Sequence, residues 1–279
     1  MKRIVFLGVV VIALIASLLV GCADKELTQE DMEQLVNDVL VANAEVETVK
    51  FDMNTTTKME VIGGPQPEGA TMAGEGTGAI DSAKRQMQII MDMDINVPGK
   101  EKQSMPMESY LVDGWMHIKV SVEEKGAQWM KMQLPDEMWD SQSAISQQIE
   151  LLQTAKEVNF LGSEDVNGMD CYVVEMVPSA EALNKMLSQM QMPDIDGADF
   201  SQLSFADMIN EMSFKQWIAK DGYLVMKSQT HVLMEMSPED IGASAEEFQK
   251  ITADQSAVMV FYDYNEPVSI KLPAEALDN

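Results

Sequence analysis

The sequence of 279 residues has few cysteines, few histidines and few basic residues. Its 2 cysteines cannot form a disulfide framework or a cysteine-rich zinc site. Its 19 Lys and Arg residues are outnumbered by 46 Asp and Glu residues, which gives a formal net charge of −27. Because so acidic a chain is not suited to neutralising phosphates, we expect no nucleic-acid partner. A hydrophobic content of 46% with 23% charged residues excludes an intrinsically disordered chain.

Motifs that would indicate catalysis are also missing. The sequence contains no Gly-x-Ser-x-Gly, phosphate loop, His-Glu-x-x-His or dinucleotide fingerprint. His117 and His231 stand alone in expected strands, which favours solvated or hydrogen-bonded strand residues over catalysts. The acidic loop 194–199 lacks the glutamate that completes an EF-hand, so any calcium binding there would be weak. We predict no enzyme activity, no catalytic residue, no metal site and no cofactor.

The first segment predicts export from the cytoplasm. Lys2 and Arg3 precede an apolar run from Ile4 to Val20, and a small residue, Gly21, follows it. This order is typical of a secretory signal. The ending Leu-Val-Gly-Cys at residues 19–22 resembles the lipobox of bacterial lipoproteins. In those proteins the signal is removed before the cysteine, which carries a diacylglyceryl group.

By this resemblance residues 1–21 are a signal peptide, Cys22 is lipidated and residues 22–27 form a tether. The alternative is an uncleaved membrane helix in which Cys22 is an ordinary thiol. Two or more acyl chains hold a protein firmly at a bilayer. We therefore expect a protein anchored through Cys22 to the outer leaflet of the cell membrane, or to an outer membrane where the source has one.

Residues 28–279 are predicted to be a single domain in which one helix precedes an antiparallel sheet. Thr28 and Asp31 form a capping box before an apolar stripe from Met32 to Leu40. Turn dipeptides at 113–114, 167–168 and 221–222 predict type I′ hairpins. Alternating apolar residues predict strands near 51–61, 87–97, 104–112, 115–122, 128–133, 169–177, 212–220, 223–236 and 254–264. The glycine-rich residues 62–79 are expected to be a loop with a weak strand near its end, and further helices are expected from Pro135, from Pro178 and over 201–212.

The order of these features resembles the LolA/LppX-like superfamily of bacterial lipoproteins. The resemblance depends on the lipobox, the first helix and the segments 110–119, 129–132, 169–178, 217–227 and 261–273. It implies an α+β fold: a curved antiparallel sheet, or half-barrel, with helices covering its concave face. It also implies an apolar cavity between sheet and helices that carries lipids or acyl chains.

Methionine is the most unusual component, with 25 residues. Met-x-Met pairs begin at Met91, Met105, Met130, Met190 and Met234, and residues i and i+2 of a strand point to the same face. The candidates for lining a ligand cavity are Met53, Met59, Met87, Ile89, Met91, Met93, Met105, Met107, Met116, Ile118, Met130, Met132, Leu224, Met226, Met234 and Met236.

Three interpretations of the methionines compete. They can replace Leu and Ile in a filled core, which would suit a structural or interaction lipoprotein without a ligand. They can line an adaptable cavity, in which an acyl chain of about 14 methylenes gains ~11 kcal/mol before the costs of association. They can bind Cu(I) through soft thioether sulfur, although the pairs are scattered along the sequence. We favour the second, a non-catalytic protein that binds or transfers an apolar ligand.

Overall fold

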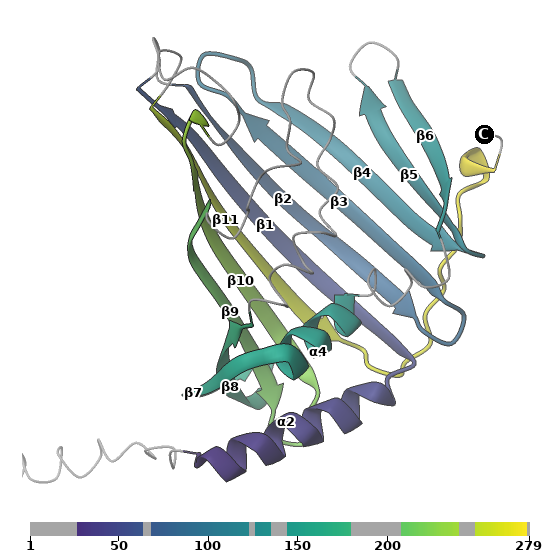
Figure 1. Ribbon diagram of the computed structural model, residues 1–279. Coiled ribbons are helices and arrows are strands. Elements are labelled where there is room, and N and C mark those ends of the chain that lie inside the picture. The colour runs from purple at the N-terminus through teal and green to yellow at the C-terminus, as the bar shows by residue number, and fades with distance from the viewer. Residues whose placement is uncertain are drawn as a thin grey trace, which may run out of the picture.

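The structure is a computed structural model, and it describes residues 27–63, 68–122, 126–134, 144–179, 208–239 and 249–277. These residues form one 11-stranded antiparallel sheet with the order β6-β5-β4-β3-β2-β1-β11-β10-β9-β8-β7. The sheet curves without closing, and two helices lie on one side of it or at its end (Figure 1). The predicted α+β half-barrel is confirmed.

The sheet consists of two meanders that meet in its middle. Strands β1 to β6 pair in sequence order, and strands β7 to β11 do likewise. Residues Lys50–Ile62 of β1 pair with the whole of β11. The strands are β1 Thr48–Ile62, β2 Glu68–Asp81, β3 Gln86–Asn96, β4 Gln103–Val112, β5 Trp115–Val122, β6 Gly126–Gln133, β7 Ala155–Val166, β8 Met169–Pro178, β9 Ile209–Ala219, β10 Val225–Met236 and β11 Lys250–Tyr262.

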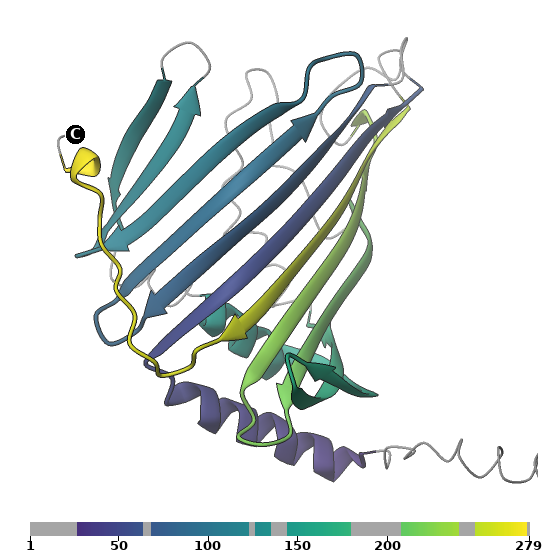
Figure 2. The same ribbon diagram turned by 180° about the vertical axis from the view of Figure 1, so that it is seen from behind.

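The helices close one end of the sheet. Helix α2, Gln29–Ala44, begins at the predicted capping box, in which the Thr28 hydroxyl accepts from the Asp31 N–H and the Asp31 carboxylate accepts from the Thr28 N–H. The buried face of α2 packs into the main core. Helix α4, Ala144–Thr154, lies over one face of the sheet, and Figure 2 shows α2 across the end of the central strands. Of the helices among the described residues, none is both long and apolar enough to span a bilayer.

All three predicted hairpins are confirmed, and two of them have the predicted turn. Asp113 and Gly114 have positive φ angles of 52° and 74°, and Asn167 and Gly168 have 52° and 85°, as a type I′ turn needs. In the hairpin of β9 and β10 the turn differs, because Gly222 and Tyr223 have positive φ in place of Asp221 and Gly222.

The weak strand expected near the end of 62–79 is present but far longer than predicted, because residues 68–81 form β2 and most of the expected loop is wrong. Its glycines Gly74, Gly76 and Gly78 leave space that large side chains of the neighbouring strands occupy. A Cβ atom at Gly78 would lie 2.1 Å from the Phe51 ring, and one at Gly74 would lie 3.1 Å from the Met91 sulfur. Tertiary packing therefore determines a strand that the local preferences of glycine disfavour.

Other predicted boundaries also change. The helix expected over 201–212 is wrong at its end, since β9 begins at Ile209, and β7 was not predicted at all. The helices expected to open at Pro135 and after Pro178 fall largely outside the described residues, as do the acidic loop 194–199 and the pair Met190/Met192. Residues 1–26, with the signal peptide, Cys22 and nearly all of the tether, are outside them too.

Candidate ligand-binding face

The pairing register places the four Met-x-Met pairs that lie in described residues on a single face of the sheet. Residues directly opposite each other in antiparallel strands share a face. Met53 lies opposite Met259, and Phe51 lies opposite Phe261. This face also meets α2 and α4 through the main core. We call it the inner face, and the opposite side the outer face.

The inner face collects nearly all of the predicted cavity residues. The register places on it Met53, Met59, Met87, Ile89, Met91, Met93, Met105, Met107, Met116, Ile118, Met130, Met132, Met234 and Met236. It adds Met72, Met176, Met212 and Met259, which the sequence did not single out. Met259 lies in the uninterrupted apolar run 257–262, where no alternation marks one face, and the glycines around Met72 obscured that residue.

Two predicted residues do not join this face. Met226 packs with Cys171 and Trp217 in a second core cluster. Leu224 lies in the connection before β10 and contacts both clusters. The bulge at the start of β10 shifts the alternation there, which places Met226 with residues of the outer face.

The inner face is a filled core at the end nearest α2. Phe51 and Phe261 are fully buried, with ring centroids 6.0 Å apart. Leu35 and Val39 of α2 and Leu152 of α4 complete this core. The interpretation of a filled core that contains methionines is therefore correct for this part of the inner face.

Farther along the strands the methionines are more open. Met59, Met130 and Met132 have exposed fractions of 36%, 52% and 51%. Met93, Met105, Met107, Met234 and Met236 are half-buried. This part of the inner face offers adaptable apolar surface that an apolar molecule can cover.

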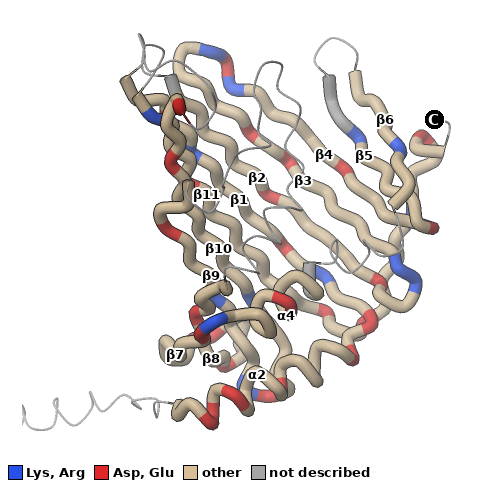
Figure 3. Tube along the Cα trace, in the orientation of Figure 1, with Lys and Arg blue, Asp and Glu red and all other residues tan. Residues whose placement is uncertain are grey.

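The inner face is uncharged over long stretches. Along β1, β3, β4, β10 and β11 none of its positions carries a charged residue. Its polar groups there are neutral, for example Thr55, Ser109, Thr230 and Gln255. Figure 3 shows the acidic residues distributed over many strands and α2, and on the five strands above they lie on the outer face.

Charged groups on the outer face pair with one another. Lys119 donates to Glu108 at 2.7 Å and holds the pKa of that carboxyl below its usual range. Burial, together with the hydrogen bond to Glu108, raises the pKa of Tyr110 to about 12. These interactions lie on the side of the sheet opposite the methionines.

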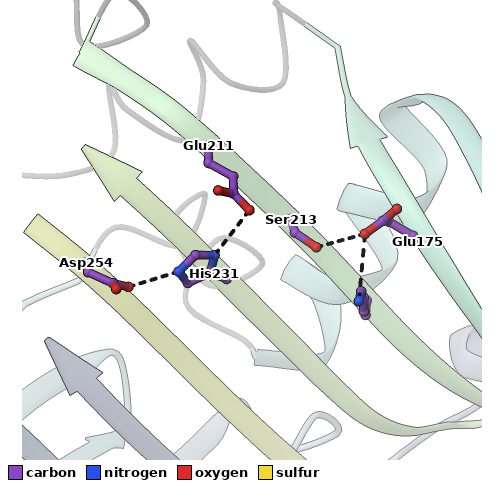
Figure 4. A network of polar contacts seen from close by, with 6 residues as sticks. Glu175, Glu211, Ser213, His231 and Asp254 are labelled. Carbon is purple, nitrogen blue, oxygen red and sulfur yellow. Dashed lines mark hydrogen bonds and ion pairs between the residues drawn. The ribbon is translucent and has the colours of Figure 1, made fainter. Parts of the chain in front are cut away.

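The two histidines also lie on the outer face. In Figure 4 the His231 imidazole faces two carboxylates, with Nε2 2.9 Å from Asp254 Oδ1 and Nδ1 3.9 Å from Glu211 Oε1. The neighbouring Ser213 hydroxyl donates to Glu175 at 3.0 Å instead. This arrangement lacks the hydroxyl–imidazole hydrogen bond of an activated serine.

His117 is buried and hydrogen-bonded to the backbone of Ala276 in the C-terminal segment, which agrees with the expectation of a hydrogen-bonded strand residue. Burial and Lys131 lower the pKa of its imidazole. Neither His117 nor His231 has the surroundings of a catalytic base.

Two grooves lie between the helices at the filled end. One, of about 840 Å³, is lined by Leu27, Met32, Glu33, Val36, Leu152, Lys156, Val158, Phe160 and neighbouring residues. The other, of about 650 Å³, lies between α2 and α4. The first groove includes Met32 and Leu152 of the main core. Neither groove is lined by the exposed Met59, Met130 or Met132.

The structure is thus an open antiparallel half-barrel with helices at its inner face and a methionine-lined surface that is uncharged over long stretches. The chain belongs to the family of unknown function DUF6612, whose profile matches residues 31–279. No curated protein matches it.

Solved structures similar to this chain include two mycobacterial proteins. The lipoprotein LppX of Mycobacterium tuberculosis is 14% identical with a TM-score of 0.45, covering 88% of this chain and 100% of LppX. LprF of Mycobacterium bovis is 9% identical with a TM-score of 0.44, covering 90% of this chain and 100% of LprF. A LolA superfamily protein of Nitrosomonas europaea is 9% identical with a TM-score of 0.23, and the match covers 87% of this chain and 94% of that protein. At these values the function has to be inferred from the residues of this chain.

Proposed function

We propose that this protein is a lipid-anchored, non-catalytic lipoprotein outside the cytoplasm that binds or transfers an apolar ligand, such as a lipid or acyl chain. The observation that carries the proposal is the inner face itself. It combines half-buried methionines with a complete lack of charged positions along β1, β3, β4, β10 and β11.

Physical chemistry supports this use of the face. Burying apolar surface contributes about 25 cal/mol per Å², and it requires no directional polar motif. Methionine has three rotatable bonds and a polarizable sulfur, so its side chain can adapt to ligands of differing shape. Introducing a carboxylate into such a surface would carry a large desolvation penalty.

The short tether supports an anchored protein. Cys22 lies five residues before Leu27, the first described residue. Since an extended chain spans at most ~3.6 Å per residue, a lipid on Cys22 would hold Leu27 within about 18 Å of the membrane surface and the start of α2 at Gln29 within about 25 Å. A ligand leaving the membrane would then have a short path to the protein.

A carboxylate on the inner face should abolish ligand binding, whereas the same change on the outer face should not. Ile89 and Ile90 are consecutive residues of β3, the first half-buried on the inner face and the second 41% exposed on the outer face. We expect Ile89→Glu to weaken binding of the apolar dye Nile red by at least about tenfold, because a buried carboxylate must be desolvated.

Ile90→Glu is the matched control and should bind the dye as the unchanged protein does. Fluorescence titration measures both affinities, and circular dichroism with thermal unfolding verifies that each variant is folded. Equal binding by the folded Ile89→Glu and Ile90→Glu variants would contradict the proposed role of the inner face.

A further inference from the structure

Two of the Met-x-Met pairs lie side by side, which the spacing along the sequence did not indicate. Met91 and Met93 belong to β3, and Met105 and Met107 belong to β4. The register pairs Met91 with Met107 and Met93 with Met105. The expectation that the pairs are scattered is therefore wrong for these two, and the four residues form a rectangle on the inner face. We call them the methionine quartet.

The dimensions of this rectangle suit a single bound ion. Its sides are one cross-strand spacing and one i to i+2 spacing, so its centre lies roughly 4 Å from each Cβ atom. A thioether sulfur is two bonds beyond Cβ on a flexible side chain. Three or four sulfurs can therefore reach one point above the sheet without any movement of the backbone.

The neighbouring strand leaves room beside the methionine quartet. Gly74 and Gly76 of β2 lie opposite Met93 and Met91. The Met91 sulfur lies over Gly74, where a Cβ atom would be only 3.1 Å from it. The Met91 thioether therefore lies on the β2 side of β3, and it would join the other three sulfurs by rotation of its flexible side chain toward β4.

The surroundings select for a soft cation. Thioether sulfur is a ligand that Cu(I) accepts and that harder ions such as Mg²⁺ or Ca²⁺ do not favour. Among the described residues there is no group of three or more His, Cys, Asp or Glu side chains that could hold a metal ion. The formal net charge of −27 makes the whole protein attractive to cations.

From this geometry we infer that Met91, Met93, Met105 and Met107 form a thioether site for a soft monovalent metal ion, Cu(I) or its redox-inert analogue Ag(I). The site is separate from the proposed function, since it depends on sulfur and not on apolar surface. Replacing methionine with leucine keeps the volume and apolar character of a side chain but removes the sulfur.

A pair of double variants tests the site. Met93→Leu with Met105→Leu removes half of the methionine quartet. Met234→Leu with Met236→Leu is the matched control, because this pair has the same spacing on the inner face but lies opposite Ala253 and Ile251. The purified protein is titrated with Ag(I), and anaerobically with Cu(I) in competition with a chromophoric chelator.

We expect the first variant to lose affinity for both ions by at least about tenfold, the lower end of the effect seen when only the groups around metal ligands are changed. The control variant should bind both ions as the unchanged protein does, and circular dichroism should show that both variants are folded. X-ray absorption of the Cu(I) form should show sulfur neighbours only. Failure of the unchanged protein to take up either ion, equal losses in both variants, or nitrogen and oxygen neighbours would each overturn the assignment.

Discussion

Replacing Phe261 with alanine is expected to lower the free energy of unfolding by about 3–5 kcal/mol, the range for removing a large buried aromatic side chain. Phe261 is fully buried where β11 meets β1, and its ring lies 6.0 Å from that of Phe51. This pair lies at the junction of the two meanders, opposite each other in register. The cavity left by the substitution would therefore weaken the contact between the two halves of the sheet.

Urea unfolding followed by circular dichroism measures this effect. Val258→Ala on the same strand is the control, since Val258 is half-buried on the outer face. This substitution should lower the free energy of unfolding by less than about 1 kcal/mol. A cost for Phe261→Ala no larger than that of the control would show that the junction is not packed as described.

Replacing Gly78 with valine is expected to lower the free energy of unfolding by about 3 kcal/mol, the upper part of the range for overpacking a core. Gly78 lies directly opposite Phe51, and a Cβ atom there would be 2.1 Å from the Phe51 ring. Because Phe51 is fully buried, its ring has no free space into which it can move.

Ala73→Val is the appropriate control for the glycine substitution. Ala73 belongs to the same strand but is exposed on the outer face, so its substitution should change stability by no more than about 0.5 kcal/mol. Thermal unfolding compares the two variants. If Gly78→Val unfolded at the same temperature as Ala73→Val, the close contact between β2 and Phe51 would be refuted.

The sequence predicted the inner face well because strand periodicity is local. Met91 and Met93 point to one side of β3 whatever the neighbouring strands do. The two-residue turn Asp113-Gly114 also determines how β4 and β5 pair, since a short hairpin sets its own register. The choice of face for Leu111 and Met116 thus follows from the sequence.

Other features depend on contacts distant in sequence and could not be predicted. The β3–β4 connection is longer, so the sequence left open the register that creates the methionine quartet. Strand β2 forms because Gly78 leaves space for Phe51, a contact between two strands that no local pattern reveals. Met226 departs from the predicted face because of a bulge, which shifts the alternation by one residue.

Organic extraction of the gently purified protein, followed by mass spectrometry, tests whether the inner face binds an apolar molecule. We predict an apolar compound, lipid or acyl chain, present in near-stoichiometric amount and lost from the folded Ile89→Glu variant but not from Ile90→Glu. A protein that is free of any such compound, and that takes up none when incubated with lipid vesicles, would contradict this account.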